Sequence, residues 1–268
     1  MAFQAKEWLP GVYHIQDAMG VCMTLLAGDE RALLADTGYG LEDVGAFVRT
    51  VTSLPLTVLL THAHHDHALG ARWFSQALLL PEDHGIFPFY TGEEKRKQVL
   101  STAREKGISV DESEFLSAPM PAPDSLKAGD IPLGNLTARV IPCPGHTPGS
   151  AVVYVPEREL LLTGDDWNPC TWLFFPEALD ARQYRENMRK LLKIPFRYVL
   201  CSHQPMLFPR EKLEAFVDGL TDEALQNAPL VPTGDRVGVR TAEARLPDGQ
   251  VFVFDIDKFQ KERKGTRP

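Results

Sequence analysis

The stretch that most constrains how this chain can fold is THAHHDH, residues 61–67, which holds four of the eight histidines. It follows an apolar run, VLL, which predicts a buried strand that ends in a cluster of metal-binding side chains. If the extended backbone continues, His62 and His64 point the same way, because side chains alternate along a strand. The backbone must then turn before Asp66 and His67, so that these two side chains face a second position next to the one that His62 and His64 face. Two adjacent cations suit the arrangement better than one, because one ion at ~2.0–2.2 Å from its ligands cannot easily take four near neighbours.

The pattern of apolar residues along the rest of the chain predicts both strands and helices. Short apolar runs between turn residues predict an antiparallel meander over residues 11–36 and hairpins over residues 151–163 and 236–256. Single strands are predicted over residues 57–61, 138–141 and 198–201. Apolar residues at helical spacing predict helices over residues 41–54, 68–79, 92–107 and 211–226, and one that starts after the capping residue Asp180. The basic end of the chain, residues 258–268, is expected to be a frayed tail.

The length of the chain, 268 residues, allows one large buried core, and we expect a single domain over residues 1–268. Residues 81–130 are the least regular portion, with a proline-rich stretch and a helix poor in apolar residues. We expect this portion to be an insertion or a lid over the metal-binding stretch. The hairpin over residues 236–256 is expected to close the domain.

The formal net charge of −8 argues against a broad surface for phosphate groups, so we expect a small-molecule substrate and no nucleic acid. The first twenty residues lack the pattern of a secretion signal, and no stretch approaches the roughly 20 apolar residues of a membrane span. We therefore expect a cytoplasmic protein without a membrane partner, and leave a homodimer open. The four cysteines lack C-x-x-C spacing, which predicts neither a disulfide framework nor a cysteine zinc site.

Three later side chains repeat the arrangement of an apolar strand followed by a metal-type residue in a turn. His146 follows the strand at 138–141, Asp165 follows an LLL run, and His203 follows the strand at 198–201. Ligands at the same ends of strands can meet at one edge of a sheet. Together with the first stretch they make five histidines and two aspartates, a set that fits two metal ions with imidazole and carboxylate ligands.

These motifs resemble those of the metallo-β-lactamase fold superfamily. Its H-x-H-x-D-H signature is matched in residues 62–67, its later histidine by His146 in GHTPG, its bridging acid by Asp165 in TGD, and its last histidine by His203. An early acid-turn motif is matched by Asp36 in DTG. The resemblance implies an α+β fold, a four-layer αββα sandwich of two mixed β-sheets flanked by helices.

The resemblance also implies how the ligands are shared between two divalent metal ions. One ion would be bound by His62, His64 and His146, the second by Asp66, His67 and His203, and Asp165 would bind both. Zinc is the first expectation, with iron or manganese also compatible with these ligands. A water or hydroxide between the ions would be the nucleophile, Asp66 would orient it or pass on its proton, and Asp36 would hold a ligand loop or imidazole.

Among the branches of the family, the seven ligands match the lactonase-like and thioesterase-like enzymes. The resemblance therefore implies a hydrolase that acts on a small carboxyl ester, thioester, lactone or amide. The mixed end of the chain differs from the helical, basic end expected of a glyoxalase II. The alternatives are a mononuclear-iron oxidoreductase of the persulfide dioxygenase type and, further off, a phosphodiesterase or RNA-processing nuclease.

Aromatic residues directly after Asp165 are the candidates for substrate binding. We expect Trp167 and Trp172, with Phe174 and Phe175, to form an aromatic wall near the metals. In the segment 81–130, the candidates for a lid are Phe87, Phe89 and Tyr90. His65, between the ligands, is expected to point away.

Overall fold

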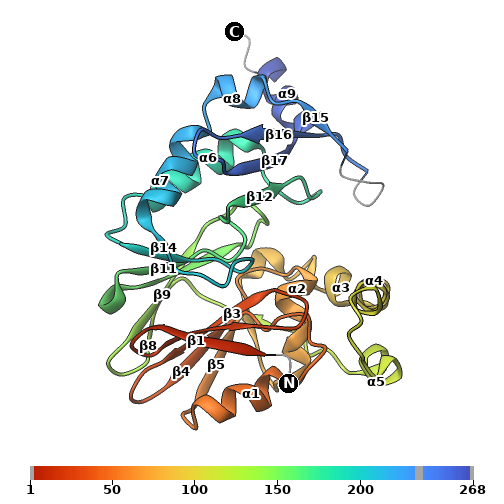
Figure 1. Cartoon of the computed structure of the whole chain (residues 1–268), viewed down its shortest axis with the longest axis vertical. Helices are drawn as coiled ribbons and strands as arrows, with labels where there is room; N and C mark the ends of the chain where they lie inside the picture. Colours follow the sequence, from red (N-terminus) through yellow and green to blue (C-terminus); the bar gives the residue numbers. More distant parts are fainter. Residues whose placement is uncertain (1–2, 233–237, 266–268) are drawn as a thin grey trace.

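The computed structural model describes residues 3–232 and 238–265, which form two packed sheets and a third, smaller sheet at one end (Figure 1). The first sheet contains seven strands in chain order; β1 to β4 pair antiparallel, and β4 to β7 pair parallel. Its strands are β1 (Gln4–Leu9), β2 (Val12–Gln16), β3 (Cys22–Ala27), β4 (Ala32–Ala35), β5 (Leu56–Leu59), β6 (Leu78–Leu79) and β7 (Asp124–Ser125).

The second sheet has six strands in the order β14-β13-β11-β10-β9-β8. Its strands are antiparallel except for β11 and β13, which run parallel with Leu162 opposite Leu200. The six strands are β8 (Gly129–Pro132), β9 (Thr137–Pro142), β10 (Ala151–Val155), β11 (Leu160–Leu162), β13 (Tyr198–Leu200) and β14 (Phe208–Pro209).

Alternating side chains explain why these sheets stack as layers. In β10, Val153 packs between the two sheets against residues such as Leu33, whereas Val152 points to the other face. In the first sheet, Leu34 points outward instead and packs on Val48 of helix α1 (Val44–Val51). Both sheets are therefore apolar on both faces and need helices outside them. This arrangement confirms the predicted α+β sandwich of two mixed sheets.

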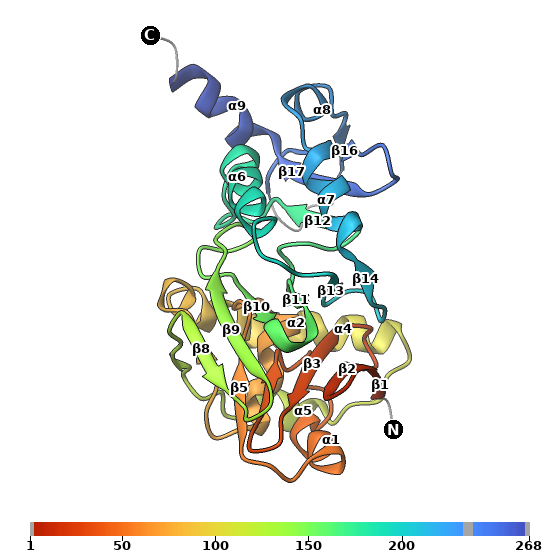
Figure 2. The same ribbon diagram turned by 90° about the vertical axis from the view of Figure 1, so that its left-hand side faces the viewer.

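The third sheet, which we did not predict, joins β12 to the end of the chain. β12 (Cys170–Leu173) pairs parallel with β17 (Val251–Asp255), which pairs antiparallel with β16 (Thr241–Arg245), and β15 (Leu230–Val231) lies at the edge. Figures 1 and 2 show this sheet and α6 to α9 gathered at one end of the molecule, beyond the sandwich. The predicted C-terminal hairpin corresponds to β16 and β17; residues 236 and 237 lie outside the described residues.

The helices divide into those of the sandwich and those of the third sheet. After β5 come α2 (His65–Ala68) and the 3-10 helix η1 (Leu69–Trp73); the segment 81–130 contains η2 (Pro81–Asp83), α3 (Phe87–Thr91), α4 (Glu93–Glu105) and α5 (Glu112–Ser117). Figure 1 shows α3 to α5 beside α2. The remaining helices are η3 (Pro156–Arg158), α6 (Ala181–Leu191), α7 (Arg210–Gly219), α8 (Asp222–Gln226) and α9 (Ile256–Gly265).

Several predicted elements are confirmed, and two helical predictions need correction. Asp180 caps α6 by accepting a hydrogen bond from the Arg182 amide (2.8 Å), as its pattern predicted. Residues 68–79 contain no long helix, because Gly70 is pressed against the turn after β4, where a Cβ would lie 1.9 Å from the Thr37 oxygen. Residues 211–226 form two helices, because the first ends before Leu220 and Thr221 caps α8.

The frayed tail was also wrong over the described part of residues 258–268. This part belongs to α9, and Lys258 Nζ donates hydrogen bonds to the carbonyl oxygens of Phe175, Pro176 and Ala178. The pattern of charges alone could not show that a lysine would bind carbonyl groups some eighty residues earlier in the chain. Across the described residues, no helix combines the length and the apolar character needed to cross a membrane.

Phe252 of β17 joins the third sheet to its helices and offers a test of this packing. Its buried ring stacks on Tyr184 of α6, with ring centroids 5.4 Å apart, and meets Phe216 of α7 edge-on. We expect Phe252→Ala to lower the free energy of unfolding by about 3–5 kcal/mol, because it leaves a large cavity. The control Leu230→Ala, at an exposed position on β15, should change it by less than about 0.5 kcal/mol. Urea denaturation measures both values, and equal small losses would contradict the packing argument.

Candidate metal centre

The seven predicted ligand residues lie in two neighbouring groups. The first group contains His62, His64 and His146, and the second contains Asp66, His67, Asp165 and His203. Within each group, one ligand atom from every residue lies within 4.8 Å of the others. The Asp165 carboxylate also reaches the first group, because its Oδ2 is 3.7 Å from His146 Nε2. The two sets therefore meet at Asp165.

Strand ends bring these residues together. The extended chain stops at Leu59, a bend carries His62 and His64, and α2 begins at His65, so that Asp66 and His67 leave from a helical turn. In the second sheet, Asp165 and His203 each follow three residues after the paired residues that end β11 and β13. Because these two strands are parallel, their ends lie at the same edge of the sheet.

Glycine is required where the two sheets meet beneath the site. Gly164, directly before Asp165, has a φ of +53°, and a Cβ there would lie 2.7 Å from Thr61 Oγ1. A larger residue would be strained by this backbone conformation and would push the histidine loop away. Gly164 therefore lets the Asp165 turn approach the histidine loop closely.

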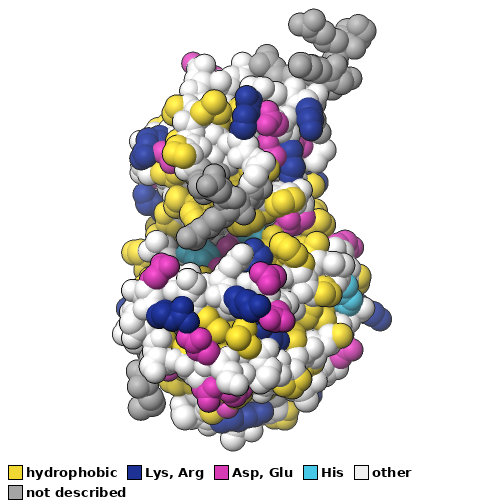
Figure 3. Space-filling model, turned by 90° about the vertical axis from the view of Figure 1, so that its right-hand side faces the viewer, with side chains coloured by type: hydrophobic (Ala, Val, Ile, Leu, Met, Phe, Trp, Pro, Cys, Tyr) yellow, Lys and Arg dark blue, Asp and Glu magenta, His cyan; other side chains and the backbone are white. Residues whose placement is uncertain are grey.

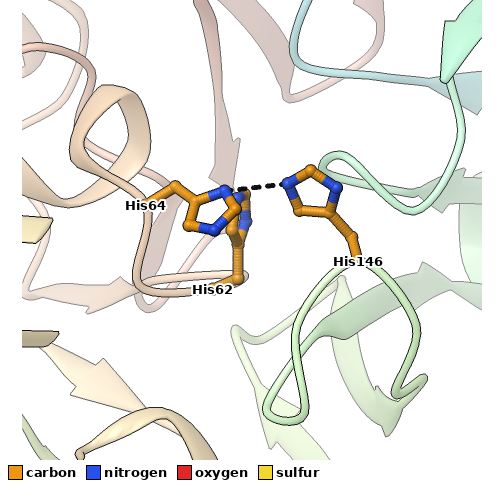
Figure 4. Close-up of side chains that lie close together, drawn as sticks. All are labelled: His62, His64 and His146. Atoms are coloured by element: carbon orange, nitrogen blue, oxygen red, sulfur yellow. Dashed lines mark hydrogen bonds between the residues drawn. The ribbon is translucent and has the colours of Figure 1, made fainter. Parts of the chain in front are cut away.

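In the first group, two imidazole nitrogens that carry no hydrogen face each other. His64 Nε2 donates to the carboxylate of Glu177 (2.8 Å), and His146 Nδ1 donates to the Trp172 carbonyl oxygen (2.8 Å). A neutral imidazole carries one N–H, so His64 Nδ1 and His146 Nε2 both present lone pairs. These two atoms are 2.8 Å apart (Figure 4). Lone pairs at this distance repel each other unless a cation binds both.

Buried ligand atoms without hydrogen bonds indicate the same fit. His67 Nδ1 donates to Asp36 Oδ2 (2.9 Å), which leaves its Nε2 free to bind a cation. His62 Nε2, His67 Nε2 and Asp165 Oδ1 are all buried and make no hydrogen bond. Buried polar atoms of this kind are rare and need a partner. Imidazole nitrogens and carboxylate oxygens are suitable ligands for zinc, iron or manganese, so the residues present fit divalent metal ions.

Asp36 lies directly behind the second group and connects it to three parts of the chain. Its carboxylate accepts hydrogen bonds from the Thr61 amide (2.7 Å), from His67 Nδ1 (2.9 Å) and from Ser202 Oγ (3.3 Å). Its φ of +65° is unusual for a residue other than glycine and costs about 1–3 kcal/mol. These hydrogen bonds hold Asp36 in that conformation and set the His67 ring.

Burial and charge shift the pKa values of the two groups in opposite directions. Burial lowers the pKa of His64 to about 4, lowers that of His146, and holds that of His62 well below its usual value. Burial would also lower the pKa of His67, but the carboxylates of Asp165, Asp66 and Asp36 raise it well above its usual value. The second group thus favours positive charge, which a metal cation would also supply.

The two groups open into one cavity of about 310 Å³. Figure 3 shows histidine and acidic side chains at the bottom of a hollow between the sandwich and the C-terminal part. Besides metal-type ligands, the cavity is lined by aromatic, amide and other side chains, namely His65, Tyr90, Lys95, Asn168, Cys170, Trp172, Phe175 and Gln204. Its walls therefore come from α2, from the segment 81–130, and from the residues around β12.

The structure separates the two tryptophans that we expected at the site. Trp172 is 49% exposed and lines the cavity, as does Phe175. Trp167 is instead fully buried in the C-terminal core, where its Nε1 donates to Gln250 (3.0 Å), so its prediction as a substrate-binding residue is wrong. A bulky side chain two residues after Asp165 fills the space between the second sheet and the third, which the sequence did not predict. His65 belongs to neither group, but it lines the cavity rather than pointing away from it.

Two acidic residues that support the site were missed by the sequence analysis. Glu177 accepts hydrogen bonds from His64 and from the Tyr90 hydroxyl. Asp83, fully buried, accepts hydrogen bonds from the Ala63 amide (3.0 Å) and the Gly149 amide (2.6 Å), and so joins the loops of the two histidine motifs. Neither belongs to a motif with ligand spacing, and nothing in the sequence distinguished either side chain from a solvated acid.

Residues 18–203 match the family model of the metallo-beta-lactamase superfamily. The chain belongs to this superfamily. This agrees with the family and fold expected from the motifs, and with a solved structure, that of the metallo-beta-lactamase family protein TTHA1429 from Thermus thermophilus. That structure has a TM-score of 0.59 and 20% identity, and the match covers 82% of each chain.

Three relatives with curated names are hydrolases. The probable metallo-hydrolase YqgX of Bacillus subtilis is 28% identical over 52% of this chain and 63% of its own length. The acyl-coenzyme A thioesterase MBLAC2 of Gallus gallus is 26% identical over 63% of this chain and 66% of its own. The hydroxyacylglutathione hydrolase of Cereibacter sphaeroides is 26% identical over 79% of this chain and 61% of its own. The chain thus spans less than two thirds of the length of these relatives.

The opposite pKa shifts predict that acid releases metal in two steps. Protons compete with metal for the same nitrogen, so the raised pKa values of His67 and His203 make the second group lose metal first as the pH falls. The lowered pKa values of the first group should keep its metal to a lower pH. Metal content after dialysis at stepped pH should show both steps in the parent protein and only the lower-pH step in His203→Ala. A single release step shared by all ligands would contradict this order.

The contact between Glu177 and His64 predicts an effect on the first group alone. Glu177→Gln removes the negative charge that holds the His64 N–H, and we expect metal affinity at the first group to fall by about 10- to 100-fold. Competition with a coloured chelator measures this affinity. Glu211→Gln, on the exposed side of α7, is the matched control and should have no effect. Equal affinity in both variants would show that Glu177 does not set the His64 ring.

Proposed function

We propose that the chain is a metal-dependent hydrolase with two metal ions, acting on a small carboxyl thioester or ester, with lactones and amides as related substrates. The observation that carries this proposal is the convergence of two groups of bare ligand atoms on one cavity. A site of one ion would leave one group without a cation. The Asp165 carboxylate, with contacts to both groups, suits a bridging ligand.

Thioesters rank first because of the relatives. Two of the named relatives act on thioesters, to judge from their names, an acyl-coenzyme A thioesterase and a hydroxyacylglutathione hydrolase. The end of this chain carries β15 to β17 as well as helices, so we do not carry the glutathione part of the substrate over to it. The proposal therefore concerns the acyl-transfer chemistry and leaves the thiol group open.

Bound divalent cations lower the pKa of water towards ~7 and polarise a carbonyl group, which supplies a nucleophile and stabilises the developing negative charge. Asp66 lines the cavity, and its Oδ2 lies 3.5 Å from His203 Nε2. Burial would raise the pKa of Asp66, but the neighbouring His67 and His65 hold it well below its usual value, so the carboxylate is ionised. An ionised Asp66 accepts a hydrogen bond from the attacking water and aims it at the carbonyl.

Aromatic side chains on the side of the first group form the expected place for the acyl chain. The Phe175 ring lies 4.5 Å from the His64 ring and 5.2 Å from the His146 ring, and the Tyr90 ring lies 4.3 Å from the His64 ring. Trp172 adds an exposed ring at the same cavity. These rings exclude water from the first group and contact an apolar acyl group.

The mononuclear-iron oxidoreductase stays an alternative with a direct test. Oxygen uptake by iron-loaded protein in the presence of a persulfide would favour it over the hydrolase. A nuclease is disfavoured by the formal charge of −8.

The bridging role of Asp165 predicts a joint loss of metal and activity. We expect Asp165→Ala to lose one or both metal ions, and hydrolysis of butanoyl N-acetylcysteamine thioester to fall to the level of chelator-treated protein. Asp218→Ala, at an exposed position on α7, is the control and should keep both. Metal analysis and thiol release measure these outcomes. Full hydrolysis by metal-free protein would refute the proposal, and full metal retention by Asp165→Ala would refute the bridge.

A further inference from the structure

We propose that Lys95 binds a negatively charged group on the substrate, so that the substrate is a carboxylate- or phosphate-bearing thioester or ester. This inference rests on the proposed function, because it concerns the cavity that contains the two metal-ligand groups. It assigns a specificity-determining residue to the segment 81–130, which we expected to be an insertion or a lid.

Lys95 lies beside the buried face of α4, which carries Arg96, Val99 and Leu100. In the first turns of α4, Glu93, Glu94 and Lys97 are exposed, and Lys97 Nζ pairs with Glu93 (2.7 Å). Lys95 is half-buried instead and lines the cavity with Tyr90. Among the described residues that line the cavity it is the sole lysine, and none of them is an arginine. Within the described part of the chain, Lys95 is therefore the only fixed positive charge that faces this cavity.

The Lys95 ammonium is held in place without using its hydrogens. Its Nζ lies 5.1 Å from the centre of the Phe89 ring and 5.4 Å from that of Tyr90, which suits a cation–π contact. Within the described residues it has no hydrogen bond and no ion pair. An ammonium has three donors, and a half-buried one gains from an acceptor that reaches it. Burial lowers the pKa of Lys95, although Glu177 opposes the shift, which indicates the cost of leaving this charge without a partner.

The nearest acid in the same wall is already occupied. Glu177 accepts hydrogen bonds from His64 and from the Tyr90 hydroxyl, and it forms no ion pair with Lys95. The other carboxylates of the cavity, Asp66 and Asp165, belong to the second ligand group. Among the described residues, no carboxylate of this cavity remains for the ammonium, so an anion from outside the chain suits it as a partner.

Tyr90 fixes where that anion lies relative to the reaction. Its ring contacts the His64 ring at 4.3 Å between centres and the Lys95 ammonium at 5.4 Å. Lys95 thus lies just across one aromatic ring from the first ligand group. A substrate with its carbonyl at the metals would place a charged group there only if few bonds separate the two. The anion could belong to the acyl part or to the leaving thiol, and the shared chemistry is a carboxylate or phosphate near the scissile bond.

Two pairs of thioesters with the same reacting bond test the proposal and separate its two sources. The acyl pair is the succinyl thioester of N-acetylcysteamine and the methyl ester of its free carboxylate; the thiol pair is the butanoyl thioester of 3-mercaptopropionate and its methyl ester. In the zinc-loaded parent protein we expect the charged member of one pair to have a kcat/KM about tenfold or more above the neutral member. In Lys95→Met this ratio should fall to about one, mainly through KM, and Lys95→Arg should restore most of it. The control Lys97→Met, two residues away and exposed, should keep the parent ratio.

Several outcomes would overturn the proposal. A charged-to-neutral kcat/KM ratio of one in the parent protein for both pairs would do so. So would a ratio that stays unchanged in Lys95→Met, even if kcat/KM falls equally for both members of the pair. If no thioester is hydrolysed, the proposed function fails, and binding decides the role of Lys95 separately. In that case zinc-loaded protein should bind glutarate more tightly than monomethyl glutarate by calorimetry, and Lys95→Met should remove this difference. Equal binding of the two in the parent protein would overturn the proposal without any reference to hydrolysis.

Discussion

The carboxylate of Asp36 is the interaction on which the rest of this site depends. It accepts hydrogen bonds from the start of the histidine loop at Thr61, from the imidazole of His67 and from Ser202 beside His203. These three partners come from the end of β5, from α2 and from the turn after β13. A buried carboxylate needs several donors, and here those donors follow strands of both sheets. The cost of its left-handed backbone is repaid by fixing the two sheets at the edge where the ligands meet.

The surroundings of each imidazole decide which nitrogen is free to bind a metal. Glu177 takes the N–H of His64, the Trp172 carbonyl takes that of His146, and Asp36 takes that of His67. Each partner selects one tautomer and turns the bare nitrogen towards the same small volume. The chain therefore stabilises the ligand geometry through neighbours that never touch a metal, which is why their removal is expected to weaken binding.

Chemistry and recognition come from different parts of the fold. The ligands lie at the edge of the sandwich, where strand ends meet, whereas the walls of the cavity come from the segment 81–130 and from the residues around β12. Lys258 of α9 holds the carbonyl groups beside Glu177, so even the C-terminal helix supports the wall. Substitutions in these walls can change which substrate fits without moving the metal-type ligands.

The sequence by itself determined the seven residues that the two groups contain, because strand ends and ligand spacing are local patterns. The family and the α+β sandwich followed from the resemblance of these motifs to those of the metallo-β-lactamase superfamily. It also indicated that the aromatic residues after Asp165 matter, but it could not separate Trp172 at the cavity from Trp167 in the core. Only the tertiary structure decided that. β12, which carries Trp172, pairs with β17 from the far end of the chain and leaves the Trp172 ring exposed, whereas Trp167, before β12, is buried and hydrogen-bonded to Gln250. The partners Glu177 and Asp83, and the inward turn of Lys95, were likewise decided by contacts between distant segments. Such contacts leave no periodic signal in the sequence, since a charged residue has the same local pattern whether its side chain is solvated or buried.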